Sequence, residues 1–287
     1  MKRRTKSIIA MIAAIIALSA ASITGHAENN GWIREWEDGE TVWHYYQNDK
    51  MKVLSWINDP ETSLWYYVNE DGNMEIGWGT GYAEGRYFNE DGIMVTGWQQ
   101  LYPPGEEDIT PTTPFYWYYF DEDGIMVTGW QKIDGDWYYF ADSQMFEYEE
   151  GQMLTGLVTI QGNTYYFDEI DGRMQQGRML TLDGDKYYFS ASGIMKKDSW
   201  VKVDNYTYYA GIDGKVLTGR SSYDLYVTTI DSVTYAFNAS GRLVTSRTIY
   251  YVDGYWTVTK PVASGEYSTY TMNVYGKGSA GTYTVNE

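Results

Sequence analysis

Residues 129–140 read GWQKIDGDWYYF, and this stretch contains the repeating element that decides the fold. An Asp-Gly pair separates two apolar runs, which is a strong hairpin signal because glycine adopts positive φ without steric cost. Side chains alternate between the two faces of a strand, so Trp137 and Tyr139 share one face. Tyr138 and Phe140 share the other face. The stretch therefore predicts a β-hairpin with aromatic side chains on both faces.

The same pattern returns in phase along the chain, with a basic period of about 20 to 22 residues and longer intervals where segments are inserted. The clean copies of the start of the hairpin are Gly77-Trp78, Gly97-Trp98 and Gly129-Trp130. The positions equivalent to that tryptophan in the other copies are Trp32, Trp56, Leu157, Arg178, Trp200, Arg220 and Arg247. A lone hairpin buries too little surface to be stable, so the repeats must stack. The sequence predicts an all-β fold, a solenoid of about ten stacked β-hairpin repeats of about 20 residues.

Segments at both ends and two insertions fall outside this repeat. Residues 1–27 have a basic start, an apolar run too short to favour a spanning helix, and small residues at the end, which is the pattern of a secretory signal peptide. We expect residues 28–248 to form the solenoid and residues 249–287 an irregular β cap, with a separate small domain as the alternative. The proline-rich insertion 102–115 and the acidic insertion 142–152 are expected to form loops.

The composition points to aromatic packing and to cationic partners. The chain has 30 Tyr and 12 Trp but no Cys, so no disulfide stabilises it in an oxidising compartment. Its formal net charge is −18, and residues 1–27 contribute basic but no acidic side chains, so the mature chain is more acidic still. Such a charge repels phosphate, which disfavours nucleic acid as a partner and favours cations. No segment after residue 27 approaches the ~20 apolar residues of a membrane span.

Residues suited to catalysis or metal binding are scarce. His44 is the only histidine after residue 27, so neither a histidine-based triad nor a histidine-rich zinc site can be assembled. Residues 121–124 read DEDG but lack the full ligand spacing of a calcium loop. The abundant carboxylates lie mostly in predicted turns, and a glycosidase-type pair among them stays as the alternative. We expect no catalytic site, no metal site and no cofactor.

Two stretches carry a family resemblance. Residues 117–130 read WYYFDEDGIMVTGW, and the WYYF of residues 137–140 is followed by MLTG at residues 153–156. They resemble the choline-binding, or cell-wall-binding, repeat family over about residues 31–248, most of the mature chain. The same hairpin resembles the glucan-binding repeats of streptococcal glucosyltransferases and the repetitive region of large clostridial toxins. The resemblance implies a non-catalytic secreted protein, associated with the cell wall or cell surface, whose partner is a cell-wall polymer such as choline-bearing teichoic acid or glycan.

The choline-binding resemblance also implies an aromatic cage between consecutive repeats. Its walls are the Gly-Trp indole, the first aromatic residue of the Trp-Tyr-Tyr strand and a tyrosine of the following repeat, with a Met or Leu nearby. A quaternary ammonium group has no hydrogen-bond donor, so aromatic faces suit it, each contributing roughly 0.5–2 kcal/mol. Carried over to this chain, the implied ligand-binding sets are Trp98, Trp117 and Tyr139 with Met126; Trp130, Trp137 and Tyr166 with Met153; and Trp56, Trp65 and Tyr87 with Met74.

The later repeats depart from this pattern. Arg178, Arg220 and Arg247 stand where the tryptophan is expected, and a guanidinium group in a cation cage repels the ligand. Asn163-Thr164, Lys186 and Thr207 stand near or at the position of the second wall. We therefore expect ligand sites in the front half, to about residue 166, and a mainly architectural role for the back half.

Two other functions remain open at this point. Exposed Tyr and Trp faces also stack on sugar rings, so recognition of glucan or host glycan is the alternative binding function. In a structural or adhesin role, the stack is a spacer and the insertions 102–115 and 142–152 make the contacts. Filling of the core and grooves is a purely structural explanation for any single tryptophan.

Overall fold

The computed structural model describes residues 29–37, 39–106, 110–219, 225–244, 248–252, 255–261, 267–271, 274–275 and 282–284, with side chains described only up to residue 244 and not at residue 234. The chain divides into two compact units, Met1–Met94 and Val95–Glu287, and each is described by itself. The segment 1–27 lies outside the described residues. Among the described residues, no helix is long and apolar enough to cross a membrane.

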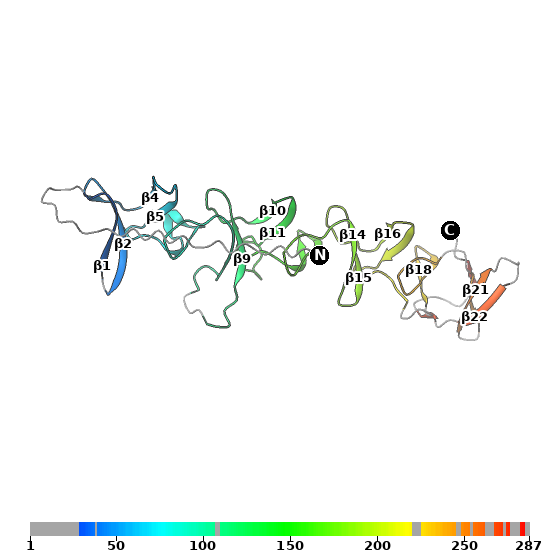
Figure 1. Ribbon diagram of the computed structural model, residues 1–287. Coiled ribbons are helices and arrows are strands. Elements are labelled where there is room, and N and C mark those ends of the chain that lie inside the picture. Colours follow the sequence, from blue (N-terminus) through cyan, green and yellow to red (C-terminus); the bar gives the residue numbers. More distant parts are fainter. Residues whose placement is uncertain are drawn as a thin grey trace. The chain divides into compact units, whose positions relative to one another are not determined.

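The first unit consists of antiparallel hairpins, which Figure 1 shows in blue and cyan. A three-stranded sheet of order β1-β2-β3 comes first, followed by the hairpins β4-β5 and β6-β7. A short 3-10 helix, η1, lies within the last hairpin. The bounds are β1 (Gly31–Glu37), β2 (Glu40–Gln47), β3 (Lys50–Met51), β4 (Ser55–Asn58), β5 (Trp65–Val68), β6 (Gly77–Trp78), η1 (Gly81–Ala83) and β7 (Tyr87–Phe88).

The second unit continues with two-stranded hairpins of five-residue strands. They are β8 (Gly97–Leu101) with β9 (Tyr116–Phe120), β10 (Gly129–Ile133) with β11 (Asp136–Phe140), β12 (Gly156–Ile160) with β13 (Asn163–Phe167), β14 (Arg178–Leu182) with β15 (Asp185–Phe189), and β16 (Ser199–Val203) with β17 (Tyr206–Ala210). The next hairpin pairs a six-residue strand, β18 (Leu225–Ile230), with β19 (Val233–Phe237). This series of hairpins confirms the predicted all-β fold.

The C-terminal part is a sheet of different order. Its strands run β22-β21-β20-β24, whereas β23 pairs in parallel with β18 of the last hairpin. The bounds are β20 (Thr248–Val252), β21 (Tyr255–Pro261), β22 (Tyr267–Thr271), β23 (Val274–Tyr275) and β24 (Thr282–Thr284). The irregular β arrangement expected after residue 248 is therefore present, and β23 joins it to the last hairpin.

The hairpin β10-β11 shows how the sequence sets the register. Asp134 and Gly135 have φ of 52° and 92°, so both residues of the turn are left-handed, as a two-residue hairpin turn of type I′ requires. Counting back from this turn places Trp130 opposite Tyr139. The turn therefore decides which aromatic residues share a face of the hairpin.

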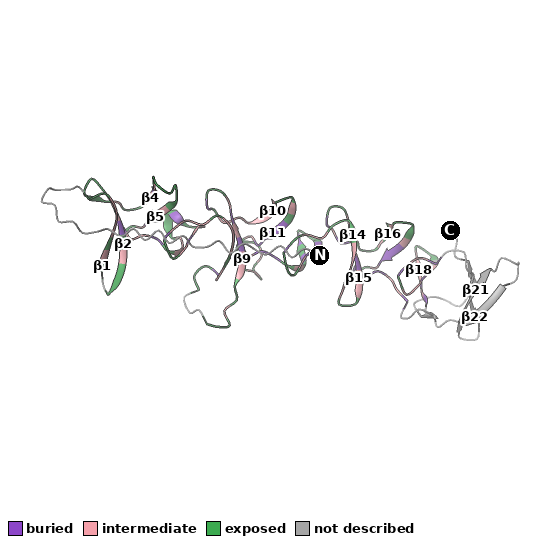
Figure 2. Ribbon diagram, in the orientation of Figure 1, coloured by how far each residue is buried: buried purple, intermediate pink, exposed green. Residues whose placement is uncertain are grey.

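Consecutive hairpins are joined by the segment that follows each aromatic strand. The backbone N–H of Met153 donates to the carbonyl oxygen of Trp117 in the preceding hairpin at 2.8 Å. The N–H of Leu154 donates to the carbonyl oxygen of Tyr139 in its own hairpin at 2.9 Å. This junction thus ties two hairpins together through backbone bonds. Where the aromatic strand ends in phenylalanine, that residue is almost fully buried, at Phe88, Phe120, Phe140, Phe167, Phe189 and Phe237. Figure 2 shows buried positions in purple along the strands.

The register corrects one prediction about the arginines. Arg178 lies opposite Phe189, which is the place that Gly129 takes opposite Phe140 in hairpin β10-β11. Met179, not Arg178, therefore occupies the tryptophan position. The hairpin turn fixes the count, and one extra residue between Gly177 and that turn shifts the arginine by one place. Arg220 and Arg247 lie outside the described residues.

Candidate aromatic ligand sites

Two tryptophans of one hairpin form a corner. The ring centroids of Trp98 and Trp117 lie 6.3 Å apart with an interplanar angle of 83°. Trp130 and Trp137 repeat this geometry at 6.1 Å and 88°. The corner follows from the register: Trp130 lies opposite Tyr139, so Trp137, two residues earlier, is a diagonal neighbour on the same face. Both predicted pairs are brought together.

The third wall of each corner comes from the following hairpin. The Tyr138 ring lies 5.0 Å from the Trp98 ring, and Tyr165 lies 4.9 Å from Trp130. One face of each hairpin thus packs against the opposite face of the next, where the first tyrosine of the Tyr-Tyr pair is located. The third walls are Tyr138 and Tyr165.

The structure places the tyrosines proposed for these walls elsewhere. Tyr139 lies on its own hairpin's tryptophan, Trp130, at 5.1 Å and donates its hydroxyl to Asp142 Oδ2 at 2.8 Å. Tyr166 lies 6.0 Å from Phe189 of the hairpin after its own. Because strand side chains alternate, a shift of one residue moves a side chain to the other face. The implied sets therefore differ from the observed ones by one residue at this wall.

The methionine that lines each corner also differs from the one assigned from sequence, and it lies later in the chain. Trp98 and Trp117 pack against a buried cluster that contains Tyr138 and Met153. The backbone N–H of Met174 donates to the carbonyl oxygen of Trp137 at 2.8 Å, so Met174 stands in the same relation to the second corner. The two observed sets are Trp98, Trp117, Tyr138 and Met153, and Trp130, Trp137, Tyr165 and Met174.

The methionines assigned from sequence have another contact in common. Each of these methionines lies against the turn glycine of the following repeat. A methyl group added at that glycine would collide with the methionine side chain, as for Met126 at Gly151, Met153 at Gly172 and Met74 at Gly92. Each methionine therefore covers the next repeat's turn, where only glycine fits. The methionine that lines a tryptophan corner belongs to the repeat after the one assigned from sequence.

The third predicted set has a cation where the tyrosine is expected. Trp56 and Trp65 form a corner with centroids 6.4 Å apart and an interplanar angle of 77°. The Arg86 guanidinium carbon lies 4.9 Å from the Trp56 ring centroid. Tyr87 instead lies opposite Trp78 within its own hairpin, with ring centroids 5.4 Å apart. Met94 takes the methionine place, because its N–H donates to the Trp65 carbonyl oxygen at 2.8 Å.

A further set was missed in the sequence. Trp32 lies 5.2 Å from Tyr66 of the following hairpin, and Trp43 is on the same face of its own hairpin. The N–H of Met74 donates to the Trp43 carbonyl oxygen at 2.8 Å. The hairpin β1-β2 is longer than the others and its aromatic strand reads WHYY, so an alignment on the Trp-Tyr-Tyr pattern passes over it. The sequence WHYY, in which a tryptophan comes two residues before a Tyr-Tyr pair, could have indicated this set.

In the later hairpins the sets are incomplete. Trp200 lies 4.8 Å from Tyr235 of the next hairpin, but Thr207 stands at the second wall opposite Lys202. Lys186 stands at the second wall of β14-β15, as predicted. Thr164 stands there in β12-β13 and accepts a hydrogen bond from Lys197 Nζ at 3.0 Å.

The tryptophan corners are accessible and differ in their polar surroundings. Trp65 is 44% exposed and Trp137 is 37% exposed, so each corner has an open side. The Tyr138 hydroxyl accepts a hydrogen bond from Arg173 Nε at 3.4 Å, and Arg173 also pairs with Asp136 at 3.2 Å. The Asp136 carboxylate therefore offsets the charge of that guanidinium.

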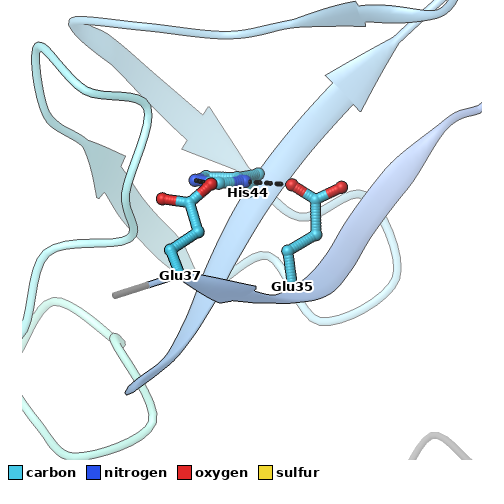
Figure 3. Close-up of side chains that lie close together, drawn as sticks. All are labelled: Glu35, Glu37 and His44. Carbon is cyan, nitrogen blue, oxygen red and sulfur yellow. Dashed lines mark hydrogen bonds and ion pairs between the residues drawn. The ribbon is translucent and has the colours of Figure 1, made fainter. Parts of the chain in front are cut away.

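His44 occupies the position in hairpin β1-β2 that Tyr138 occupies in hairpin β10-β11. Unlike Tyr138, it faces acidic groups. The imidazole is 2% exposed. Its Nδ1 lies 2.6 Å from Glu35 Oε2, and its Nε2 lies 3.9 Å from Glu37 Oε1 (Figure 3). The Nε2 also lies 2.7 Å from Asn73 Oδ1. Burial lowers its pKa, but the hydrogen bonds to Glu35 and Asn73 and the charge of Glu37 outweigh burial and raise it.

The same three groups are close enough together to hold a metal ion. One ligand atom each of Glu35, Glu37 and His44 lies within 4.8 Å of the others. Both imidazole nitrogens already have hydrogen-bond partners, and acceptors on both sides favour the protonated imidazole. The arrangement is best explained as a proton-holding cluster on the hairpin β1-β2.

Comparison with known proteins identifies the repeats. A family model described as choline-binding repeat matches residues 115–145 and 154–200, and one described as putative cell wall binding repeat matches residues 55–74. No curated protein sequence matches the chain.

Several solved structures are similar to the chain. CbpF in complex with ipratropium is 29% identical over 80% of this chain and 63% of its own, with a TM-score of 0.47. CbpJ from Streptococcus pneumoniae TIGR4 is 22% identical over 83% of this chain and 94% of its own, with a TM-score of 0.44. The modular autolysin LytC from Streptococcus pneumoniae, in complex with a synthetic peptidoglycan ligand, is 22% identical over 82% of this chain, with a TM-score of 0.46. The chain spans 63% of the CbpF structure and 52% of the LytC structure.

Proposed function

Because this chain carries repeats of the choline-binding, or cell-wall-binding, family, we propose that it is a secreted, non-catalytic protein of the bacterial surface that binds a cell-wall polymer through choline or a similar cationic group. The aromatic corners at Trp98 and Trp130 hold that group. The matched segments 115–145 and 154–200 include most of the residues of these two corners.

One observation carries the proposal: the same corner recurs with the same dimensions. Two nearly perpendicular indoles and a tyrosine of the next hairpin meet at Trp98 and again at Trp130. A quaternary ammonium group cannot donate a hydrogen bond, so several electron-rich ring faces and an apolar methionine are the environment that suits it. A corner built only to fill the core would not leave Trp137 more than a third exposed.

The charge of the chain supports a cationic ligand. Its formal net charge is −18, which attracts ammonium groups and repels phosphate-rich polymers that lack them. A polymer with many choline groups could engage several corners of one chain at once, and linked sites strengthen binding beyond that of one site. We therefore expect weak binding of free choline and much stronger binding of the polymer.

Isothermal titration of the chain from residue 28 onward with choline tests this proposal. Heat of binding in the millimolar range, with a rise in the unfolding temperature, is the expected result. A pull-down on purified cell walls, with free choline as competitor, tests the polymer. No heat, no stabilisation and wall binding indifferent to choline would together contradict the proposal.

Exposed aromatic side chains outside the corners favour a second ligand class, sugar rings. Trp36 in β1 is 73% exposed and Tyr82 in η1 is 77% exposed. Flat aromatic faces of this kind stack on glucan or other glycans. Binding to glucan beads that choline does not displace, and that Trp36→Ala with Tyr82→Ala abolishes, would favour this function over cation binding.

A further inference from the structure

The corner formed by Trp56 and Trp65 contains a cation from the chain itself. The Arg86 guanidinium carbon lies 4.9 Å from the centroid of the Trp56 ring. This distance is within the range of a cation–π contact. Arg86 is half-buried and precedes Tyr87 in β7, the aromatic strand of the following hairpin.

Arg86 takes the place of the third wall. In the intact corners, the ring of Tyr138 lies 5.0 Å from Trp98, and the ring of Tyr165 lies 4.9 Å from Trp130. All three side chains come two residues before the buried phenylalanine of the next hairpin, which is Phe88 in the case of Arg86. The guanidinium group therefore approaches the indole from the same side and at the same distance as the tyrosines do.

The rest of this corner is intact. Trp56 also contacts Tyr67 of its own hairpin at 5.0 Å and Phe88 of the next at 5.9 Å, as Trp98 contacts Tyr119 and Phe140. Trp56 and Met94 pack against the buried cluster around Phe88. The side chain at position 86 is thus the feature that distinguishes this corner from the two that carry a tyrosine.

Other cations near tryptophans are placed differently. Lys132 Nζ lies 5.8 Å from the Trp137 ring, but Lys132 is the cross-strand neighbour of Trp137 in the same hairpin and is exposed. Its long stem can swing into solvent. Arg86 reaches Trp56 from the next hairpin, and its planar guanidinium group can stack on an indole in a way that an ammonium group cannot.

We propose that Arg86 is a resident internal ligand that closes the Trp56–Trp65 corner to external cations. This rests on the proposed function, because it assumes that the corners with Tyr138 and Tyr165 take a cationic group. A positive charge already on the indole repels a second one at this range. The corner then stabilises the contact between hairpins β4-β5 and β6-β7 and takes no choline.

Replacement of the arginine by the residue of the intact corners tests this assignment. Isothermal titration with choline is carried out on the whole chain from residue 28, on Arg86→Tyr and on Arg86→Gln. We expect both variants to bind one more choline per chain than the unchanged protein, Arg86→Tyr more tightly than Arg86→Gln. Arg178→Tyr is the matched control, because the Arg178 guanidinium contacts the Gln175 amide at 3.1 Å in the other unit. An equal number of sites in all four proteins would overturn the assignment.

A second measurement is independent of choline. The ring current of Trp56 should shift the side-chain protons of Arg86 upfield in the NMR spectrum, and Trp56→Leu should remove this shift. The protons of Arg178 serve as the reference. If no protein bound choline, the proposed function would fail, while an upfield shift would still support the resident guanidinium. Arg86 protons at ordinary positions would overturn it.

Discussion

The indole of Trp98 and the phenol ring of Tyr138 lie with their centroids 5.0 Å apart at an angle of 65°, although they belong to two different hairpins. This contact shows that a ligand site here is made by stacking and not by one hairpin. The same face of Tyr138's hairpin buries Phe140, so the residues that hold the stack together also position the wall of the site. Stability and binding can therefore be separated only by residues at the open side of a corner.

Trp117 is such a residue, because it is half-buried and forms the outer wall of the Trp98 corner. Trp117→Ala should remove one aromatic face, which contributes roughly 1–2 kcal/mol to binding of a cation. The affinity of that corner for choline should fall about 5- to 30-fold in isothermal titration. Trp117→Phe, which keeps a ring, should retain most of it. A loss of heat at every corner in Trp117→Ala would contradict independent sites.

Two glycines with positive φ, one at the start of strand β12 and one in the turn after β13, offer a test of the stack itself. Gly156 and Gly172 have φ of 76° and 72°, so alanine costs about 1–2 kcal/mol at either from backbone strain alone. A methyl group at Gly156 meets no atom within 4 Å, whereas at Gly172 it collides with the Met153 side chain. Met153 is buried, so its displaced thioether must repack, which lowers stability further. Thermal unfolding should therefore show Gly172→Ala to be less stable than Gly156→Ala, and equal unfolding temperatures would contradict the contact.

The hairpins could be predicted from sequence because their determinants are local. Asp134 and Gly135 specify a left-handed turn, and the aromatic pattern follows at a fixed distance from it. The period is repeated in phase, so the whole series could be recognised. Arg178 was assigned to the wrong place because the copies were aligned on the glycine before the strand, whereas counting back from the turn at Asp183 and Gly184 places Met179 there.

The third and fourth walls of the sites could not be predicted in the same way. They depend on which face of the next hairpin meets the tryptophan corner, and a shift between Tyr138 and Tyr139 reverses that face. Nothing within one hairpin specifies how the next is placed on it. The guanidinium group of Arg86 was missed for the same reason, since the sequence alignment pointed to Tyr87.

Buried tyrosines should make stability fall in alkali. Burial and the hydrogen bond to Asp142 raise the pKa of Tyr139 to about 12, and Tyr139 is 4% exposed. Below pH 10 both folded and unfolded chains keep this proton, so the stabilisation is complete. Between about pH 10 and 12 the unfolded chain loses the proton first, and the free energy of unfolding falls by about 1.4 kcal/mol per pH unit for this group.

Tyr139→Phe should remove the contribution of Tyr139 to the fall of the free energy of unfolding between about pH 10 and 12. The variant should be less stable at neutral pH by roughly 1–2 kcal/mol, because the Asp142 carboxylate loses a partner. Urea unfolding at several pH values between 9 and 12 measures both effects. Tyr209, whose pKa is raised to about 12 by its hydrogen bond to Asp198 and by burial, keeps its own contribution. An unchanged slope in Tyr139→Phe would contradict the raised pKa.

His44 should titrate above its ordinary range. Although burial lowers its pKa, the hydrogen bonds to Glu35 and Asn73 and the charge of Glu37 raise it above 6.5. Below pH 6.5 both states of the chain are protonated, so the stabilisation is complete there. As the pH rises from 6.5 through the folded pKa this stabilisation is lost, because the folded chain still holds a proton that the unfolded chain has already released.

The Cε1 proton of His44 in the NMR spectrum reports this pKa directly. Glu35→Gln removes the carboxylate that lies 2.6 Å from Nδ1, so the pKa of His44 should move down, and the fall in stability with rising pH should become shallower. Glu40→Gln, an exposed position on the same hairpin, is the matched control and should change neither. A midpoint at or below 6.5 in the unchanged protein would show that burial outweighs the two carboxylates.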